Sequence, residues 1–166
     1  MLKNQKISGY TLVETVIYLA ILAVVISAVM GLTVSMIKVL AEVRINQALT
    51  SSAQSSLELM VRQTRGANEI DTGVSVFDIN PSRLFIDSFD ESGDPVTYDF
   101  YIAQDKMLLS TNGGQGINLL AESVVVESFV VNYFSGLNTE GVKIELIISD
   151  SRNNRSRSFL TTVIRR

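Results

Sequence analysis

Cysteine and histidine, two residue types common in enzyme active sites, do not occur in this 166-residue sequence. Without cysteine, neither a disulfide framework nor a thiolate nucleophile is possible. Without histidine the commonest general base is missing, and the two absences together remove the usual ligands of transition metals. Carboxylates, hydroxyls, lysine and arginine remain, and they form no recognisable catalytic pattern. The sequence therefore predicts a protein that is not an enzyme and has no cofactor or metal.

A strong charge of either sign is also lacking, since 14 basic and 17 acidic residues leave a net charge of −3. This balance gives no reason to expect contact with nucleic acid. Apolar residues are abundant, with a hydrophobic content of 46% and a mean hydropathy of +0.27. They are concentrated in residues 15–37, which contain no charged side chain. About 20 apolar residues suffice to cross a bilayer as a helix, so this stretch predicts a single transmembrane span.

The residues before the apolar stretch are short and basic. Residues 1–9 contain Lys3 and Lys6 and no acid, a pattern that places the N-terminus of the span in the cytoplasm. One alternative is a secretory signal peptide that is removed after its apolar region, but such regions are usually only about 7–15 residues long. A second alternative is a plain signal anchor that is never cleaved.

The pattern from Lys6 to Glu14 resembles the class III signal of type IV prepilins. Gly9 ends the basic leader, Tyr10 supplies the aromatic residue that follows, and Glu14 stands fifth after the leader, directly before the apolar stretch. The resemblance implies that a prepilin peptidase cuts between Gly9 and Tyr10 and methylates the new amine of Tyr10. It implies further that Glu14 pairs with the terminal amine of a neighbouring subunit. A simpler role for Glu14 is to stabilise the positive end of its own helix.

The resemblance also predicts location and partners. The chain would cross the inner membrane once, with its head outside the cytoplasm, and would then enter a filament. Its partners would be prepilin peptidase, other pilin-like subunits and the inner-membrane assembly platform.

The helical pattern continues beyond the apolar stretch. Residues 38–65 contain no proline or glycine, and one apolar stripe recurs at helical spacing: Ile45, Leu49, Ala53, Leu57 and Met60. Gly66 is a natural helix stop. We therefore expect a leader at 1–9, a membrane or filament-core helix at 10–37, an amphipathic helix at 38–66 and a globular head at 67–166. Gly31 weakens the helix without breaking it.

Short alternating segments separated by turn residues predict a β-rich head. The candidate strands are residues 74–79, 84–89, 96–102, 107–110, 123–134, 142–148 and 158–164. A mainly antiparallel sheet packed on the amphipathic half of the helix follows from this order. The expected fold class is α+β.

Two loops in the head resemble binding sites only superficially. The acidic turn that holds Asp87, Asp90, Glu91 and Asp94 could bind Ca²⁺, but it lacks a recognised spacing and a solvated hairpin turn is the simpler interpretation. The glycine-rich residues 112–116 lack the lysine and following helix of a phosphate-binding loop.

The order of the parts resembles the larger minor pilins and the J-type minor pseudopilin of type II secretion. The similar segments are residues 59–65, 96–98 and 159–165. The resemblance implies a structural minor subunit of a pilus, a competence filament or a type II secretion pseudopilus. The competing hypothesis is an unprocessed, signal-anchored extracytoplasmic binding protein that keeps residues 1–9.

Overall fold

A computed structural model describes residues 11–90, 92–136, 139–151 and 155–165. The chain divides into two compact units, Met1–Arg44 and Ile45–Arg166. One helix, α1 (Leu12–Arg65), contributes residues to both units. Together with two antiparallel sheets it confirms the predicted α+β fold class.

Helix α1 has 54 residues and no interruption, including at Gly31. A helical glycine costs only about 1 kcal/mol relative to alanine, which a long helix tolerates. The helix ends directly before Gly66, whose N–H donates to the carbonyl oxygen of Arg62 at 3.2 Å. The predicted helix stop at Gly66 is therefore confirmed.

The first unit contains the apolar part of α1. An 18-residue window of the helix reaches a mean hydropathy of 2.5, and none of this window is buried. Large apolar side chains are exposed all round the helix, from Leu12 at 80% to Val43 at 44%. A helix in the core of a soluble domain would be mostly buried. This segment has the length and composition to cross a membrane.

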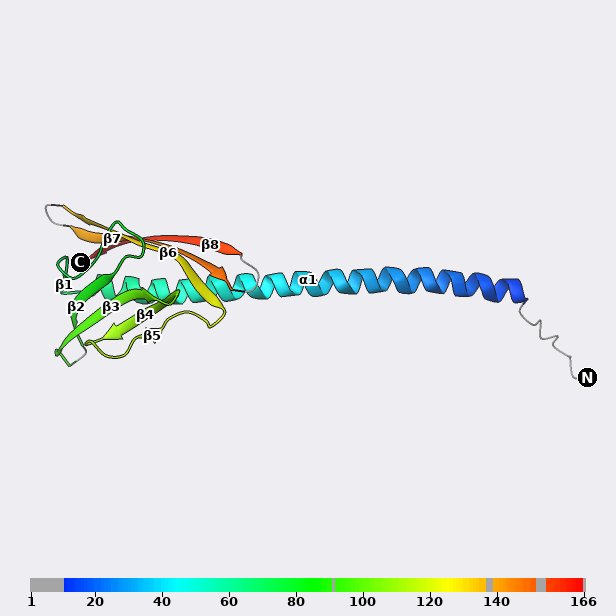
Figure 1. Cartoon of the computed structure of the whole chain (residues 1–166), viewed down its shortest axis with the longest axis horizontal. Coiled ribbons are helices and arrows are strands. Elements are labelled where there is room, and N and C mark those ends of the chain that lie inside the picture. The colour runs from blue at the N-terminus through cyan, green and yellow to red at the C-terminus, as the bar shows by residue number, and fades with distance from the viewer. Residues whose placement is uncertain (1–10, 91, 137–138, 152–154, 166) are drawn as a thin grey trace, which may run out of the picture. The chain divides into compact units, whose positions relative to one another are not determined.

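The second unit is the head, and its core begins on α1. The predicted apolar stripe is confirmed, because Leu49, Ala53, Leu57 and Met60 are buried and Ile45 is half-buried. Both sheets lie alongside this part of α1 (Figure 1). Burial of each large side chain contributes about 1.5–3 kcal/mol, so the helix is an integral part of the folded head.

The first sheet has the order β1-β2-β3-β4-β5, and all its pairs are antiparallel. Its strands are β1 (Glu69–Ile70), β2 (Leu84–Phe89), β3 (Pro95–Ala103), β4 (Lys106–Thr111) and β5 (Ile117–Asn118). Leu84, Ile86 and Phe100 point into the core from this sheet.

The second sheet has the order β6-β7-β8 and is also antiparallel. It consists of β6 (Val124–Ser135), β7 (Glu140–Asp150) and β8 (Ser156–Arg165). The alternation predicted for β7 is confirmed, because Val142, Ile144, Leu146 and Ile148 are fully buried while the residues between them are half-exposed. The head therefore has two sheets where the sequence predicted one.

The strand predicted at residues 74–79 is wrong. This segment is a loop with one isolated bridge, between Val76 and Arg83. An aspartate turn begins it, because Asp71 Oδ1 accepts hydrogen bonds from the N–H groups of Gly73 and Val74. Asp78 then adopts a positive φ of 63°, which a continuous strand does not permit.

Candidate functional site

Glu14 lies in the first turn of α1, where Thr11 caps the helix. The Oγ1 atom of Thr11 accepts a hydrogen bond from the N–H of Glu14 at 3.3 Å. Thr11 and Glu14 have the spacing of a capping box, in which a hydroxyl residue precedes a glutamate by three positions. The carboxylate also lies at the positive end of the helix dipole. The contact with Thr11 fixes the backbone of Glu14 at the start of the helix, while the role of its carboxylate at the positive end stays a prediction.

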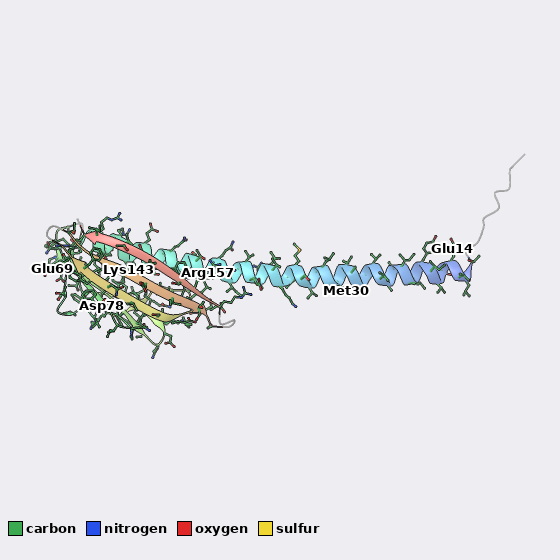
Figure 2. The ribbon with its side chains drawn as sticks, turned by 90° about the horizontal axis from the view of Figure 1, so that it is seen from above. Glu14, Met30, Glu69, Asp78, Lys143 and Arg157 are labelled. Atoms are coloured by element: carbon green, nitrogen blue, oxygen red, sulfur yellow. The ribbon has the colours of Figure 1, made fainter. Side chains whose placement is uncertain are left out.

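The side chain of Glu14 is half-exposed. Its Oε1 atom accepts a hydrogen bond from the Tyr18 hydroxyl, one turn further along the helix, at 3.3 Å. This distance is longer than the usual 2.7–2.8 Å of such bonds, so the contact between the two side chains is weak. Figure 2 shows Glu14 on the first turns of α1. A cationic partner can reach this carboxylate from outside the helix.

The other hydroxyl groups of the apolar stretch bond to their own helix. Ser27, Thr33 and Ser35 donate to the carbonyl oxygens four residues earlier, at 2.7, 2.9 and 3.0 Å. These bonds satisfy the hydroxyls without any outside partner, as a lipid environment requires. Glu14 is consequently an acidic group at the start of an apolar helix whose hydroxyl side chains donate their hydrogen bonds within the helix.

The remaining predicted site residues lie outside the described residues. They are Lys3, Lys6, Gly9 and Tyr10. The predicted cleavage position between Gly9 and Tyr10 therefore stays a prediction on the pattern of the sequence. Thr11, directly after Tyr10, is the first residue that the structure describes.

In the head, the best-formed ion pair joins Arg83 to Asp99. Two parallel hydrogen bonds connect them, Nε to Oδ1 at 2.8 Å and a terminal nitrogen to Oδ2 at 2.6 Å. The hydrogen bond to Asp99 raises the pKa of Arg83, and the guanidinium carbon lies 6.0 Å from the centre of the Tyr101 ring. The pair lines an open hollow of about 480 Å³. Each charge therefore has its partner in the other, and the pair links the residue before β2 to β3.

A second group of polar side chains connects the three strands of the second sheet, β6, β7 and β8. Glu140 accepts a hydrogen bond from the Tyr133 hydroxyl at 2.8 Å and forms an ion pair with Arg165 at 2.6 Å. Arg165 also donates to the carbonyl oxygen of Asn68, just after α1. The hydrogen bond to Glu140 raises the pKa of the Tyr133 phenol. Neither this group nor the pair above could be identified from the sequence, because the contacts depend on how the strands pair.

The acidic turn is a hairpin turn between β2 and β3, as predicted. Asp90 Oδ1 accepts hydrogen bonds from the N–H groups of Ser92 and Asp94 at 2.8 and 2.9 Å. Glu91 lies outside the described residues, and the residues that the structure does describe contain no group of three acidic side chains placed to hold a metal. Residues 112–116 form the loop between β4 and β5, which confirms that prediction.

A family model for the prokaryotic N-terminal methylation motif matches residues 4–30. The match includes the end of the basic leader, Gly9, Tyr10, Glu14 and the apolar stretch as far as Met30. No curated protein and no solved structure matches the chain. Proteins with this pilin-like motif are structural and not catalytic. The match and the unburied apolar helix fit a membrane-anchored protein, and the N-terminus of this chain carries a type IV pilin-like prepilin signal.

Proposed function

We propose that the chain is a structural minor pilin or pseudopilin subunit of a type IV filament. One observation carries the proposal: the methylation motif matched at residues 4–30 ends inside an apolar, unburied helix that continues into the core of a folded head. Such a chain has the two parts that a filament subunit requires, a helix for packing with other helices and a head for the filament surface.

Processing is the first step of the proposed function. Prepilin peptidase removes residues 1–9 by cutting between Gly9 and Tyr10 on the cytoplasmic side, and then methylates the amine of Tyr10. Lys3 and Lys6 hold the leader in the cytoplasm until the cut. Glycine suits the position because a residue without Cβ lets another backbone approach closely.

Assembly is the second step and depends on Glu14. Cleavage creates a free α-amine four residues before this carboxylate. The carboxylate of an incoming subunit pairs with the terminal amine of a neighbour already in the filament. Low dielectric among packed helices strengthens this attraction, while desolvation offsets much of the gain. The pair therefore fixes the register of the incoming subunit more than it adds stability.

Three sequence features support a minor subunit. The head lacks the C-terminal cysteine pair of many major pilins, the apolar helix lacks their proline, and the segments cited above resemble the J-type minor pseudopilin of type II secretion. A subunit of this kind primes assembly or occupies the filament tip, in a pilus, a competence filament or a secretion pseudopilus.

Filament entry in the parent cells tests the proposal. We expect the wild-type chain to be found in sheared filaments. The Glu14→Gln variant should be cleaved normally, but its amount in sheared filaments should be at least tenfold lower than that of the wild type. Glu42→Gln removes a charge from the same helix and should enter filaments as the wild type does. A chain that never leaves the membrane fraction would favour the second candidate, a signal-anchored extracytoplasmic binding protein.

A further inference from the structure

The two sheets of the head have four edges, and they differ in how they are protected. The first sheet ends on both sides in strands of only two residues, β1 and β5. Very short edge strands are one way in which proteins prevent unwanted strand pairing. The first sheet therefore offers little edge to another chain.

The β6 edge of the second sheet is covered by a loop. The N–H groups of Asp78 and Ser82 donate to the carbonyl oxygens of Val131 and Phe129, each at 2.9 Å. In return, the N–H of Val131 donates to Ser82 Oγ and that of Phe129 to Asn80 Oδ1, each at 3.0 Å. Backbone and side chains of the loop thus take the place of a neighbouring strand.

The opposite edge, β8, has no such cover. Strand β8 has ten residues and pairs along its length with β7, and among the residues that the structure describes no backbone pairs with its other side. Alternate N–H and carbonyl groups of an edge strand point away from its sheet. A long row of backbone donors and acceptors is therefore left for water or for another chain.

The sequence of β8 lacks the usual protection against strand addition. It contains no proline and no lysine, its register with β7 has no bulge, and residues 158–164 are uncharged and rich in β-branched side chains. Leu160 and Ile164 are 62% and 50% exposed. Natural edge strands usually carry a charged side chain, a proline or a bulge. Residues 158–164 have none of the three, since the charges of β8 stand at Arg157 and Arg165, and this favours a strand that is covered in the assembled state.

We propose that β8 is a docking edge onto which another pilin-like subunit adds an extended, acidic strand. The charge of β8 selects the acidic partner, because the strand contains no acid and one of its two arginines faces solvent. Arg165 is paired with Glu140, whereas Arg157 is exposed on β8, next to the β7 strand (Figure 2). Backbone hydrogen bonds supply affinity in strand addition, and alternate side chains supply specificity.

A second copy of this chain fits the edge less well. Antiparallel pairing of two β8 strands would place no acid opposite Arg157, because β8 contains none. Two copies paired in this way also form a closed two-fold dimer, whereas a filament grows through heterologous contacts. An acidic strand from a different subunit avoids both problems. The identity of the partner as a pilin-like subunit rests on the proposed function.

Photocrosslinking of the full chain in the parent cells tests the proposal. The photoreactive residue p-benzoylphenylalanine replaces Leu160 or, as a second position, Thr162. Ile117, 67% exposed on the other sheet, is the matched control. We expect the two β8 positions to crosslink to one other pilin-like subunit, within an extended segment that contains Asp or Glu, at least tenfold more than the control. Crosslinks to a second copy of this chain, or equal crosslink yields from the β8 positions and the control, would overturn the proposed docking edge.

Two proline variants distinguish strand addition from contact through side chains. The N–H groups of Thr161 and Thr162 point to opposite edges of β8, so proline at one position removes a donor to β7 and proline at the other removes a donor to the free edge. The variant that keeps the wild-type melting temperature should lose at least nine-tenths of the Leu160 crosslink. A full crosslink in that variant would contradict strand addition.

The same cells separate failure of this inference from failure of the proposed function. Cleavage at Gly9 and the presence of the Ile117 control variant in filaments report on the proposed function alone. A processed, filament-bound chain without a specific β8 crosslink would refute only the docking edge.

Discussion

Identical substitutions in the two halves of α1 should have different effects on the stability of the head. Leu49 is fully buried in the core, whereas Leu22 is 53% exposed in the apolar stretch. Leu49→Ala removes three buried carbon atoms and leaves a cavity, at a cost of about 2–5 kcal/mol. A change of 1 kcal/mol shifts the melting temperature of a domain of this size by roughly 3–5 °C. We therefore expect Leu49→Ala to lower the melting temperature by about 6–25 °C.

Leu22→Ala is the matched control and should leave the melting temperature of the head unchanged within about 2 °C, because a side chain outside the core contributes little to its packing. The assay is thermal unfolding of the full chain in detergent micelles, followed by circular dichroism of the β-structure and the tyrosines. An equal loss in both variants would refute the division of α1 into a membrane half and a head half. A loss of unfolding free energy below about 1 kcal/mol in Leu49→Ala would also refute this division.

Three further predictions concern the head. Thr64 Oγ1 is buried and has no hydrogen-bond partner among the residues that the structure describes, so Thr64→Val should stabilise the head by about 1–2 kcal/mol in the same assay, and Thr64→Ser should not. A Cβ at Gly141 would meet the backbone carbonyl oxygen of Val163 first, and then the Phe134 ring at 2.7 Å, so Gly141→Ala should destabilise the head by about 1–3 kcal/mol. An unchanged melting temperature would contradict the packing of the second sheet. The raised pKa of Tyr133 means that its phenol contributes stability below the ordinary tyrosine pKa of about 10 and loses it as pH rises through the folded pKa. Tyrosinate absorbance should show a phenol that titrates above the ordinary tyrosine pKa, and Glu140→Gln should lower the pKa of that phenol.

Elements with a strong local pattern could be predicted from the sequence. The apolar stripe and the absence of proline indicated α1, and Gly66 indicated its end. Strict alternation from Val142 to Ile148 indicated β7 and its buried face. These features depend on the period of side chains along one element, which the sequence displays directly.

Features that depend on pairing between distant segments could not be predicted. Residues 74–79 have the apolar residues of a strand, but two features favour a loop. A turn forms at Asp71, and the N–H of Asp78 donates to the carbonyl oxygen of Val131 on the edge of β6. The short strands β1 and β5 exist because they pair with neighbours, and the division into two sheets is a tertiary property. The Arg83–Asp99 pair likewise depends on the register of β2 against β3.

For the candidate site, the sequence predicted Glu14 and its place before the apolar helix, and the structure adds the capping contact with Thr11. The cleavage position at Gly9 and Tyr10 lies outside the described residues and stays a prediction. The open β8 edge could not be found from the sequence, since an edge strand is recognised only when the order of the sheet is known.

The most direct test of the central claim is the N-terminus of the mature protein. The full chain is expressed with an active prepilin peptidase, and its intact mass and N-terminal sequence are determined. The account predicts a chain that begins at N-methylated Tyr10, with cleavage lost in Gly9→Val and retained in the matched Gly31→Val, whose added side chain meets only open space. A wild-type chain that keeps residues 1–9 in the presence of active peptidase would contradict the account and leave the signal-anchored binding protein as the better explanation.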